Sequence, residues 1–167
     1  MVVIDFTTIN STLTLLDAQY SGTVDANMQT LYSKLAVLEF CGWIEVSFDT
    51  LWHDYVDRKL AVPDNVARIK NIIKKNYGFA YDTNIYPVMC SVLGVNNWEN
   101  VLDAFPAIDF TNMNAVLNSY ISLRNSAAHT NTTPGVTPSF MAPSSVMYDY
   151  NKVKPGFQYL ESSFNAL

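Results

Sequence analysis

Charged residues are scarce in this chain of 167 residues, where they make up 15% of the sequence against about 25% in an ordinary domain. Aromatic residues are plentiful at 13%. Interfaces between subunits are typically depleted of charge and enriched in aromatic side chains. We therefore expect the protein to self-associate, although a polar surface rich in Asn, Ser and Thr would give the same composition.

Cysteine and histidine are nearly absent, with two residues of each. Cys41 and Cys90 lie in apolar stretches of the sequence, which predicts buried free thiols in a reducing compartment rather than a disulfide framework. Two histidines and two cysteines in such settings do not suggest a zinc site. We expect no bound metal and no cofactor.

Long apolar runs are also missing, since no window approaches eighteen uninterrupted apolar residues. The first six residues lack the basic and apolar regions of a secretory signal. These features predict a cytoplasmic protein without membrane association. The net charge of −5 argues against a broad basic field that coats nucleic acid, but it leaves room for a small local phosphate site.

The hydrophobic pattern predicts a single all-α domain over residues 1–167, a compact bundle of about five to six helices. Residues 1–22 are rich in Thr and Ser and are expected to form a loose N-terminal arm. Residues 130–156 hold four prolines and many Ser and Thr residues without periodicity, which predicts a long loop before the last helix.

The individual helices are predicted from caps and apolar spacing. Asp25 or Asn27 is suited to cap a long helix that runs to about Leu60, and Gly42 within it indicates a kink or a close helix approach. Pro63 is expected to open the next helix. Further helices are expected to begin near Asn84, near Asn96, and at Thr111 or Asn112.

The hexapeptide Arg-Asn-Ser-Ala-Ala-His, from Arg124 to His129, lies near the end of the last long helix before the predicted loop. A guanidinium suits phosphate oxygens, and an imidazole moves protons near neutral pH. Asn125 and His129 are four residues apart and share a helical face, so the amide can orient a ring nitrogen. The alternative is structural: Arg124 pairs with an acid or caps carbonyls, and His129 is hydrogen-bonded nearby.

The spacing within the motif limits how it can act. Arg124 and His129 are five residues apart and project about 140° from each other on a regular helix. One regular helix cannot easily direct both at a single atom. Either the helix distorts near its end, or the site is shared between two copies across a two-fold interface.

This motif fits the R-x4-6-H signature of the HEPN superfamily, including the polar residue that follows the arginine. The segment from Leu38 to Glu45 resembles the corresponding region of bacterial RiboL-PSP-type HEPN domains, and the resemblance covers roughly residue 25 onwards. It implies a metal-independent endoribonuclease of a toxin–antitoxin or other bacterial defence system, a homodimer with a composite site. Asn131 stands where HEPN toxins controlled by a nucleotidyltransferase antitoxin carry a tyrosine, which weakens the case for that kind of antitoxin.

The residue types agree with the chemistry that the resemblance implies. RNA cleavage without a metal uses the substrate 2′-hydroxyl as nucleophile, a proton carrier, and positive charge beside the phosphorane. His129 would move the proton, Arg124 would stabilise charge, and Asn125 would orient the histidine or a phosphate oxygen. The resemblance also implies that Glu45 accepts a hydrogen bond from Arg124 or His129, as acidic residues in this part of HEPN domains sometimes do; the alternative is an exposed helical carboxylate. The runner-up is a non-catalytic HEPN-like module that binds RNA, a nucleotide or a protein partner.

Basic residues gather in one part of the sequence, with six of the ten positive charges between residues 58 and 75. They predict a patch that contacts the RNA backbone, although a solvated helix face is the plainer interpretation. The candidates for RNA contact are Arg68, Lys70, Lys74 and Lys75. Tyr148 and Tyr150, in the predicted loop, are candidates to stack on a base.

Overall fold

The computed structural model describes residues 1–130 and 139–167 of the chain. The described residues form seven α-helices and one π-helical turn, so the all-α prediction is confirmed and the predicted count of five to six helices is too low. In chain order they are α1 (Phe6–Gly22), α2 (Ala26–Lys59), α3 (Pro63–Lys74), η1 (Tyr81–Ile85), α4 (Tyr86–Leu93), α5 (Val95–Asp103), α6 (Ala107–His129) and α7 (Pro143–Ala166).

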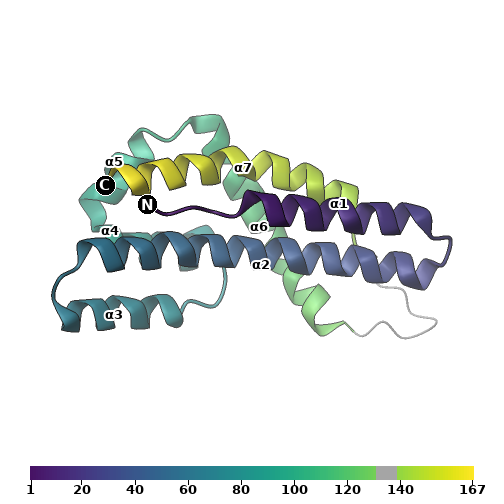
Figure 1. Ribbon diagram of the computed structural model, residues 1–167, viewed down its shortest axis with the longest axis horizontal. Coiled ribbons are helices and arrows are strands. Elements are labelled where there is room, and N and C mark those ends of the chain that lie inside the picture. The colour runs from purple at the N-terminus through teal and green to yellow at the C-terminus, as the bar shows by residue number, and fades with distance from the viewer. Residues whose placement is uncertain (131–138) are drawn as a thin grey trace.

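The longest helix, α2, runs through the whole length of the molecule, and the other elements pack along it (Figure 1). Its N-cap is Asp25, one of the two predicted residues, whose Oδ1 accepts hydrogen bonds from the amides of Asn27 and Met28. The helix continues through Gly42 without ending. A Cβ built on Gly42 would meet nothing within 4 Å, so the close helix approach predicted there does not occur within one chain.

The predicted N-terminal arm, residues 1–22, is mostly helical. The Asp5 side chain accepts hydrogen bonds from two amides of the first turn and starts α1, and Ile9 and Leu13 bury one side of the helix. Figure 1 shows α1 lying alongside α2, running in the opposite direction. Only residues 1–5 are extended, and Val2 and Ile4 within them are buried. The prediction of a loose arm was wrong, because the apolar spacing and the Asp5 cap stabilise a helix despite the Thr- and Ser-rich composition.

The second half of the predicted loop, residues 143–156, is helical as well. Residues 131–138 lie outside the described part of the chain, and α7 begins at Pro143, where a proline at the first helical position costs no hydrogen bond. The buried stripe of α7 recurs every three or four residues and consists of Val146, Tyr150, Val153, Phe157, Leu160 and Phe164.

This stripe overturns one prediction about the tyrosines. Tyr150 is fully buried and its hydroxyl donates to the Phe6 carbonyl at 2.9 Å, so it cannot stack on a base. Tyr148 is exposed on the outside of α7.

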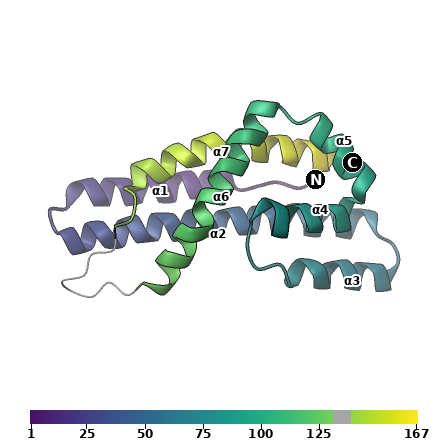
Figure 2. The same cartoon turned by 180° about the vertical axis from the view of Figure 1, so that it is seen from behind.

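Helix α6 begins at Ala107, four residues before the predicted cap at Thr111 or Asn112. It packs against α7 where Gly156 lies: a Cβ there would approach the Met113 side chain to 3.2 Å. Figure 2 shows α6 crossing α2 obliquely near the middle of α2. The C-terminal end of α6, which carries the motif, therefore lies beside the middle of α2.

The helices α3, α4 and α5 gather at the C-terminal end of α2. The start of α3 at Pro63 is confirmed, and the helix ends at Lys74. Gly78 has a φ of 135°, a conformation open to glycine, and it turns the chain sharply after α3. This turn, residues 75–80, carries Tyr77 back towards α2.

Aromatic side chains fill the core where α2 meets α6 and α7. Phe40 stacks on Trp43 at 6.0 Å between ring centroids and meets Tyr120 edge-on at 4.8 Å, and Trp43 also contacts Phe157 of α7. This rigid cluster holds the motif helix in place. Within the described ranges, no helix is both long and apolar enough to span a membrane.

Candidate functional site

The motif occupies the last two turns of α6, which stays helical through His129 and ends with Thr130 as its C-cap. Because the helix does not end early, the 140° separation of Arg124 and His129 holds in the folded chain. Tyr120 points into the core, and His129 follows it by nine residues, half a turn out of phase. His129 therefore lies on the outer side of α6 and is exposed.

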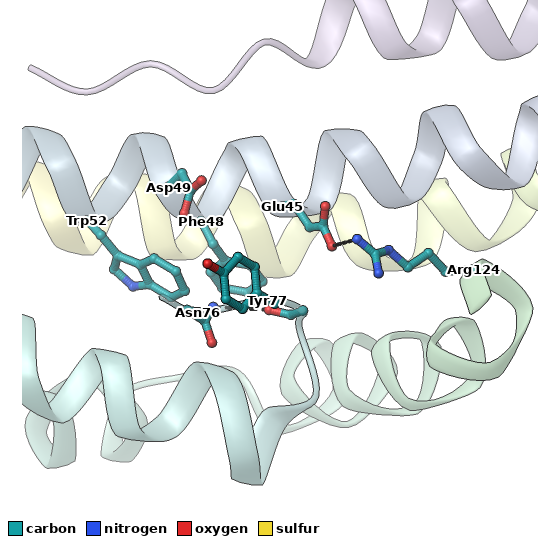
Figure 3. Close-up of a pocket in the computed structure, with 8 residues that line it drawn as sticks. Glu45, Phe48, Asp49, Trp52, Asn76, Tyr77 and Arg124 are labelled. Carbon is teal, nitrogen blue, oxygen red and sulfur yellow. Dashed lines mark hydrogen bonds and ion pairs between the residues drawn. The ribbon is translucent and has the colours of Figure 1, made fainter. Parts of the chain in front are cut away.

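Arg124 faces α2 instead. Its Nη2 lies 3.0 Å from Oε1 of Glu45, and the two side chains keep 38% and 31% of their surfaces exposed (Figure 3). The Glu45 Oε1 atom is shielded from solvent, and no donor among the described residues is aligned to hydrogen-bond it, so the contact is an ion pair only. A guanidinium has five N–H donors, and among the described residues Glu45 is the acid that Arg124 pairs with, which leaves donors for a ligand.

Beside this ion pair lies a pocket of about 100 Å³ between α2 and the turn after α3. We call it the α2–turn pocket. Its lining residues are Glu45, Phe48, Asp49, Trp52, Asn76, Tyr77, Gly78 and Arg124. A second pocket of about 80 Å³ lies on the other side of the turn and is also lined by Arg124, together with Asn125. The guanidinium thus reaches two pockets.

The charges beside the pocket respond to partial burial. Asp49 is exposed by surface area, yet burial against the pocket wall raises the pKa of its carboxyl, and His53 one turn away acts in the opposite direction. Burial, with the Glu45 charge adding to it, raises the pKa of the Cys41 thiol to about 12, while Arg124 lowers it slightly. Cys41 therefore stays a neutral thiol beneath the ion pair.

Asn125 is exposed and is the polar neighbour of Arg124 on α6. Its predicted role in orienting His129 stays a prediction, since no hydrogen bond joins their side chains in the described structure. A residue that the sequence analysis missed is Lys34 of α2, whose Nζ donates to the Thr130 carbonyl at 2.8 Å. It caps the C-terminal end of α6 and places a positive charge near His129. The sequence feature that could have revealed this role was a lysine within the apolar repeat of α2.

The predicted basic patch is only partly available. Arg68, Lys74 and Lys75 are exposed on α3 and just after it, whereas Lys70 forms an ion pair with Asp57 of α2. The upstream Arg58 is occupied within the fold, because it pairs with Asp54 and donates to the Phe164 carbonyl. The free charges closest in sequence to the pocket are Lys74 and Lys75, which precede Asn76 and Tyr77.

No group of three or more His, Cys, Asp or Glu side chains in residues 1–130 and 139–167 is arranged to hold a metal ion. Comparisons with protein-family models, curated proteins and solved structures found no match for this chain. Its function must therefore be inferred from the geometry of α6, α2 and the turn after α3.

Proposed function

We propose that the protein is a metal-independent endoribonuclease that cleaves RNA through the substrate 2′-hydroxyl. The observation that supports this best is that Arg124 is partly exposed, lines two pockets and, within the described part of the chain, is paired with Glu45 alone. A phosphate held there would have its developing negative charge stabilised. His129, exposed at the end of the same helix, moves the proton.

The active unit in this proposal is a homodimer. Arg124 faces α2 and His129 faces outward, so a single copy does not direct both at one phosphate. A two-fold axis that brings the outer side of one α6 towards the Arg124 edge of another pairs each arginine with the partner's histidine.

A surface suited to the second copy lies on α2, next to the ion pair. Apolar or small residues recur there every three or four positions, and we call this surface the α2 seam; it consists of Met28, Leu31, Leu35, Leu38, Gly42 and Val46. Such a repeat is that of a helix-to-helix seam, and it is complementary to a copy of itself. Val46 is 64% exposed, and the space above Gly42 is empty within one chain. The scarcity of charge in the sequence agrees with a covered surface of this kind.

A groove beside the seam supports the same arrangement. Its volume is about 460 Å³ and it lies between α1 and α2, with Ile9 and Thr12 on one wall and Leu38, Gly42 and Val46 on the other. Side chains of a second seam would fill it. The biological setting that goes with this proposal is bacterial defence or a toxin–antitoxin system, with an antitoxin or another defence protein as partner.

The decisive experiment is to incubate the purified protein with total RNA in excess EDTA. We expect cleavage fragments that end in a 2′,3′-cyclic phosphate and begin with a 5′-hydroxyl. His129→Ala and Arg124→Ala proteins, folded as the wild type by circular dichroism, should leave the RNA intact. Cleavage by these variants at the wild-type rate contradicts the proposal.

The ion pair between Arg124 and Glu45 favours a second candidate, a non-catalytic module that binds RNA, a nucleotide or a protein partner. In that case Glu45 holds Arg124 as part of a binding surface, and no chemistry occurs there. The same incubation separates the two candidates, because the binding module shifts labelled RNA in a gel without shortening it.

A further inference from the structure

The α2–turn pocket has features that the proposed chemistry does not use. We propose that it is a base-binding subsite that selects guanine in single-stranded RNA, next to the phosphate held by Arg124. This inference rests on the proposed function for the identity of that phosphate, whereas the binding of the base can be tested without any cleavage.

The walls of the pocket suit one flat ring. Phe48 and Trp52 are almost completely buried and form its apolar wall, and the Tyr77 ring is 81% exposed at its rim (Figure 3). An exposed tyrosine on a turn is poorly explained by core packing, but it is well placed to stack on a base. A pocket of about 100 Å³ has room for a single base and not for a base pair.

The polar groups that the pocket offers to a ligand are hydrogen-bond acceptors. The Asn76 amide is used internally, because Nδ2 donates to the Gly78 carbonyl at 3.1 Å and Oδ1 accepts from Asn84 at 2.8 Å. Oε1 of Glu45 is shielded and faces Arg124, so what remains are the two carboxylate oxygens of Asp49 on the pocket wall. A ligand that fits must therefore present N–H groups to them.

Guanine meets this requirement better than the other bases. Its Watson–Crick edge presents the ring N1–H and the exocyclic N2 amine side by side, and two adjacent donors match the two oxygens of one carboxylate. Adenine and cytosine place an acceptor nitrogen next to their amino group, which would face a carboxylate unfavourably. Uracil presents one N–H between two carbonyl oxygens. The pocket thus favours guanine for two reasons: a carboxylate attracts the paired donors of guanine, and it repels the acceptor atoms of the other bases.

The surroundings favour a nucleotide over a cationic side chain, which could also present paired N–H donors. Arg124 lines the pocket, and Lys74 and Lys75 directly precede its Asn76–Tyr77 edge, so the positive charge nearby attracts phosphate and repels a second cation. Asp49 lies four residues beyond Glu45 on α2, about 6 Å further along the helix axis and away from Arg124 (Figure 3). Base and phosphate of one nucleotide can span that interval.

The test measures binding by calorimetry with ligands that cannot be cut. The probes are the four 3′-nucleoside monophosphates, and 2′-O-methyl pentaribonucleotides that carry either one guanine or none. We expect 3′-GMP and the guanine-containing oligonucleotide to bind at least tenfold more tightly than their counterparts. Asp49→Asn should remove at least tenfold of this preference, and Tyr77→Ala should weaken all bases alike. Asp103→Asn on α5 is the matched control and should leave the preference unchanged.

Each outcome has a defined meaning. Equal affinity for the four nucleotides, binding of free 3′-GMP without binding of the oligonucleotide, or tighter binding of an arginine-containing peptide overturns the inference. A guanine preference in a protein that does not cut RNA keeps the inference and removes the proposed function. Cleavage without any guanine preference keeps the proposed function and removes the inference.

Discussion

The two ends of the hexapeptide are one and a half helical turns apart, yet they belong to different environments. Arg124 is half-buried, paired with Glu45 and in contact with two pockets. His129 is exposed on the outer side of α6, and Lys34 holds only the backbone next to it. In the proposed function, the anchored end at Arg124 holds the phosphate, and the free end at His129 meets a second copy of the chain.

The difference shows why a sequence motif is not yet a site. A helix that continues to its last residue keeps Arg124 and His129 about 140° apart, and the fold does nothing to bring them together. If both residues act on one phosphate, as proposed, a second molecule must place its His129 beside Arg124, so the proposal predicts a dimer.

The largest expected effect is at the free end. His129→Ala should lower the rate of RNA cleavage at least about 100-fold, because positioned proton transfer contributes that much or more. The melting temperature should not change, since the side chain is exposed. Timed digestion of labelled RNA and thermal melting measure the two quantities. Ser122→Ala on the same exposed side of α6 is the control, and a similar loss of rate there would remove the special role of His129.

Mixing inactive copies tests the shared site directly. In a heterodimer of Arg124→Ala and His129→Ala chains, one of the two sites receives both intact residues and the other receives neither. Equal amounts of the two chains, refolded together, should therefore recover about a quarter of the wild-type activity, because about half of the dimers are mixed. Recovery near zero, with dimers present, would mean that each site uses one chain only.

A single charge on the α2 seam should disrupt the association of two copies of the chain. Val46→Glu places a carboxylate on the most exposed seam residue, and we expect the dimer to dissociate into monomers with at least a tenfold loss of cleavage. Sedimentation velocity measures the association. Ile108→Glu, on an equally exposed apolar side chain at the start of α6, should leave both properties unchanged. A Val46→Glu protein that remains a dimer would place the interface elsewhere.

A smaller effect is expected at the anchored end. Arg124→Ala and Glu45→Gln should each lower the free energy of unfolding by no more than about 1 kcal/mol, because a partly exposed ion pair contributes little. The double variant should lose less than the sum of the two, since both changes remove one interaction. Urea denaturation of the four proteins measures this. Strict additivity would mean that the ion pair does not stabilise the fold.

The thiol beneath the ion pair gives the smallest effect. Because the pKa of Cys41 is raised to about 12, the thiol stays protonated and unreactive up to about pH 10, where it begins to ionise. Iodoacetamide at pH 8 should modify the partly exposed Cys90 but not Cys41 in the native protein, and both cysteines in urea. Mass spectrometry of tryptic peptides counts the modified sites. Modification of native Cys41 would show that the anchored end opens in solution.

The parts of the fold that could be predicted are those in which local and tertiary signals agree. Asp25 and the apolar repeat after it predicted α2 well, and Pro63 marked the start of α3. The first half of α7, up to residue 156, was missed because Pro155 and Gly156 interrupt its pattern locally. Gly156 is nevertheless required there, since Met113 of α6 packs against it. Packing between helices thus overrides the low local helix propensity of proline and glycine.

The candidate site was predictable to the same degree. The resemblance suggested Glu45 as a partner for Arg124 or His129, and in the fold Glu45 forms an ion pair with Arg124. The contribution of Tyr77 and Asn76 was not foreseen, since it depends on a turn at Gly78 that returns the chain to α2. No spacing along the sequence relates residue 77 to residue 124, and only the folded chain brings them together.

The extended first residues have a consequence for how the protein is made. The amides of Val2 and Ile4 donate to the side chains of Asn165 and Glu161, so the beginning of the chain is held by the last turns of α7 (Figure 1). About 160 residues must be synthesised between the two partners. On the ribosome, the amides of Val2 and Ile4 therefore lack these two acceptors until α7 has been synthesised, so the extended segment reaches its folded contacts late.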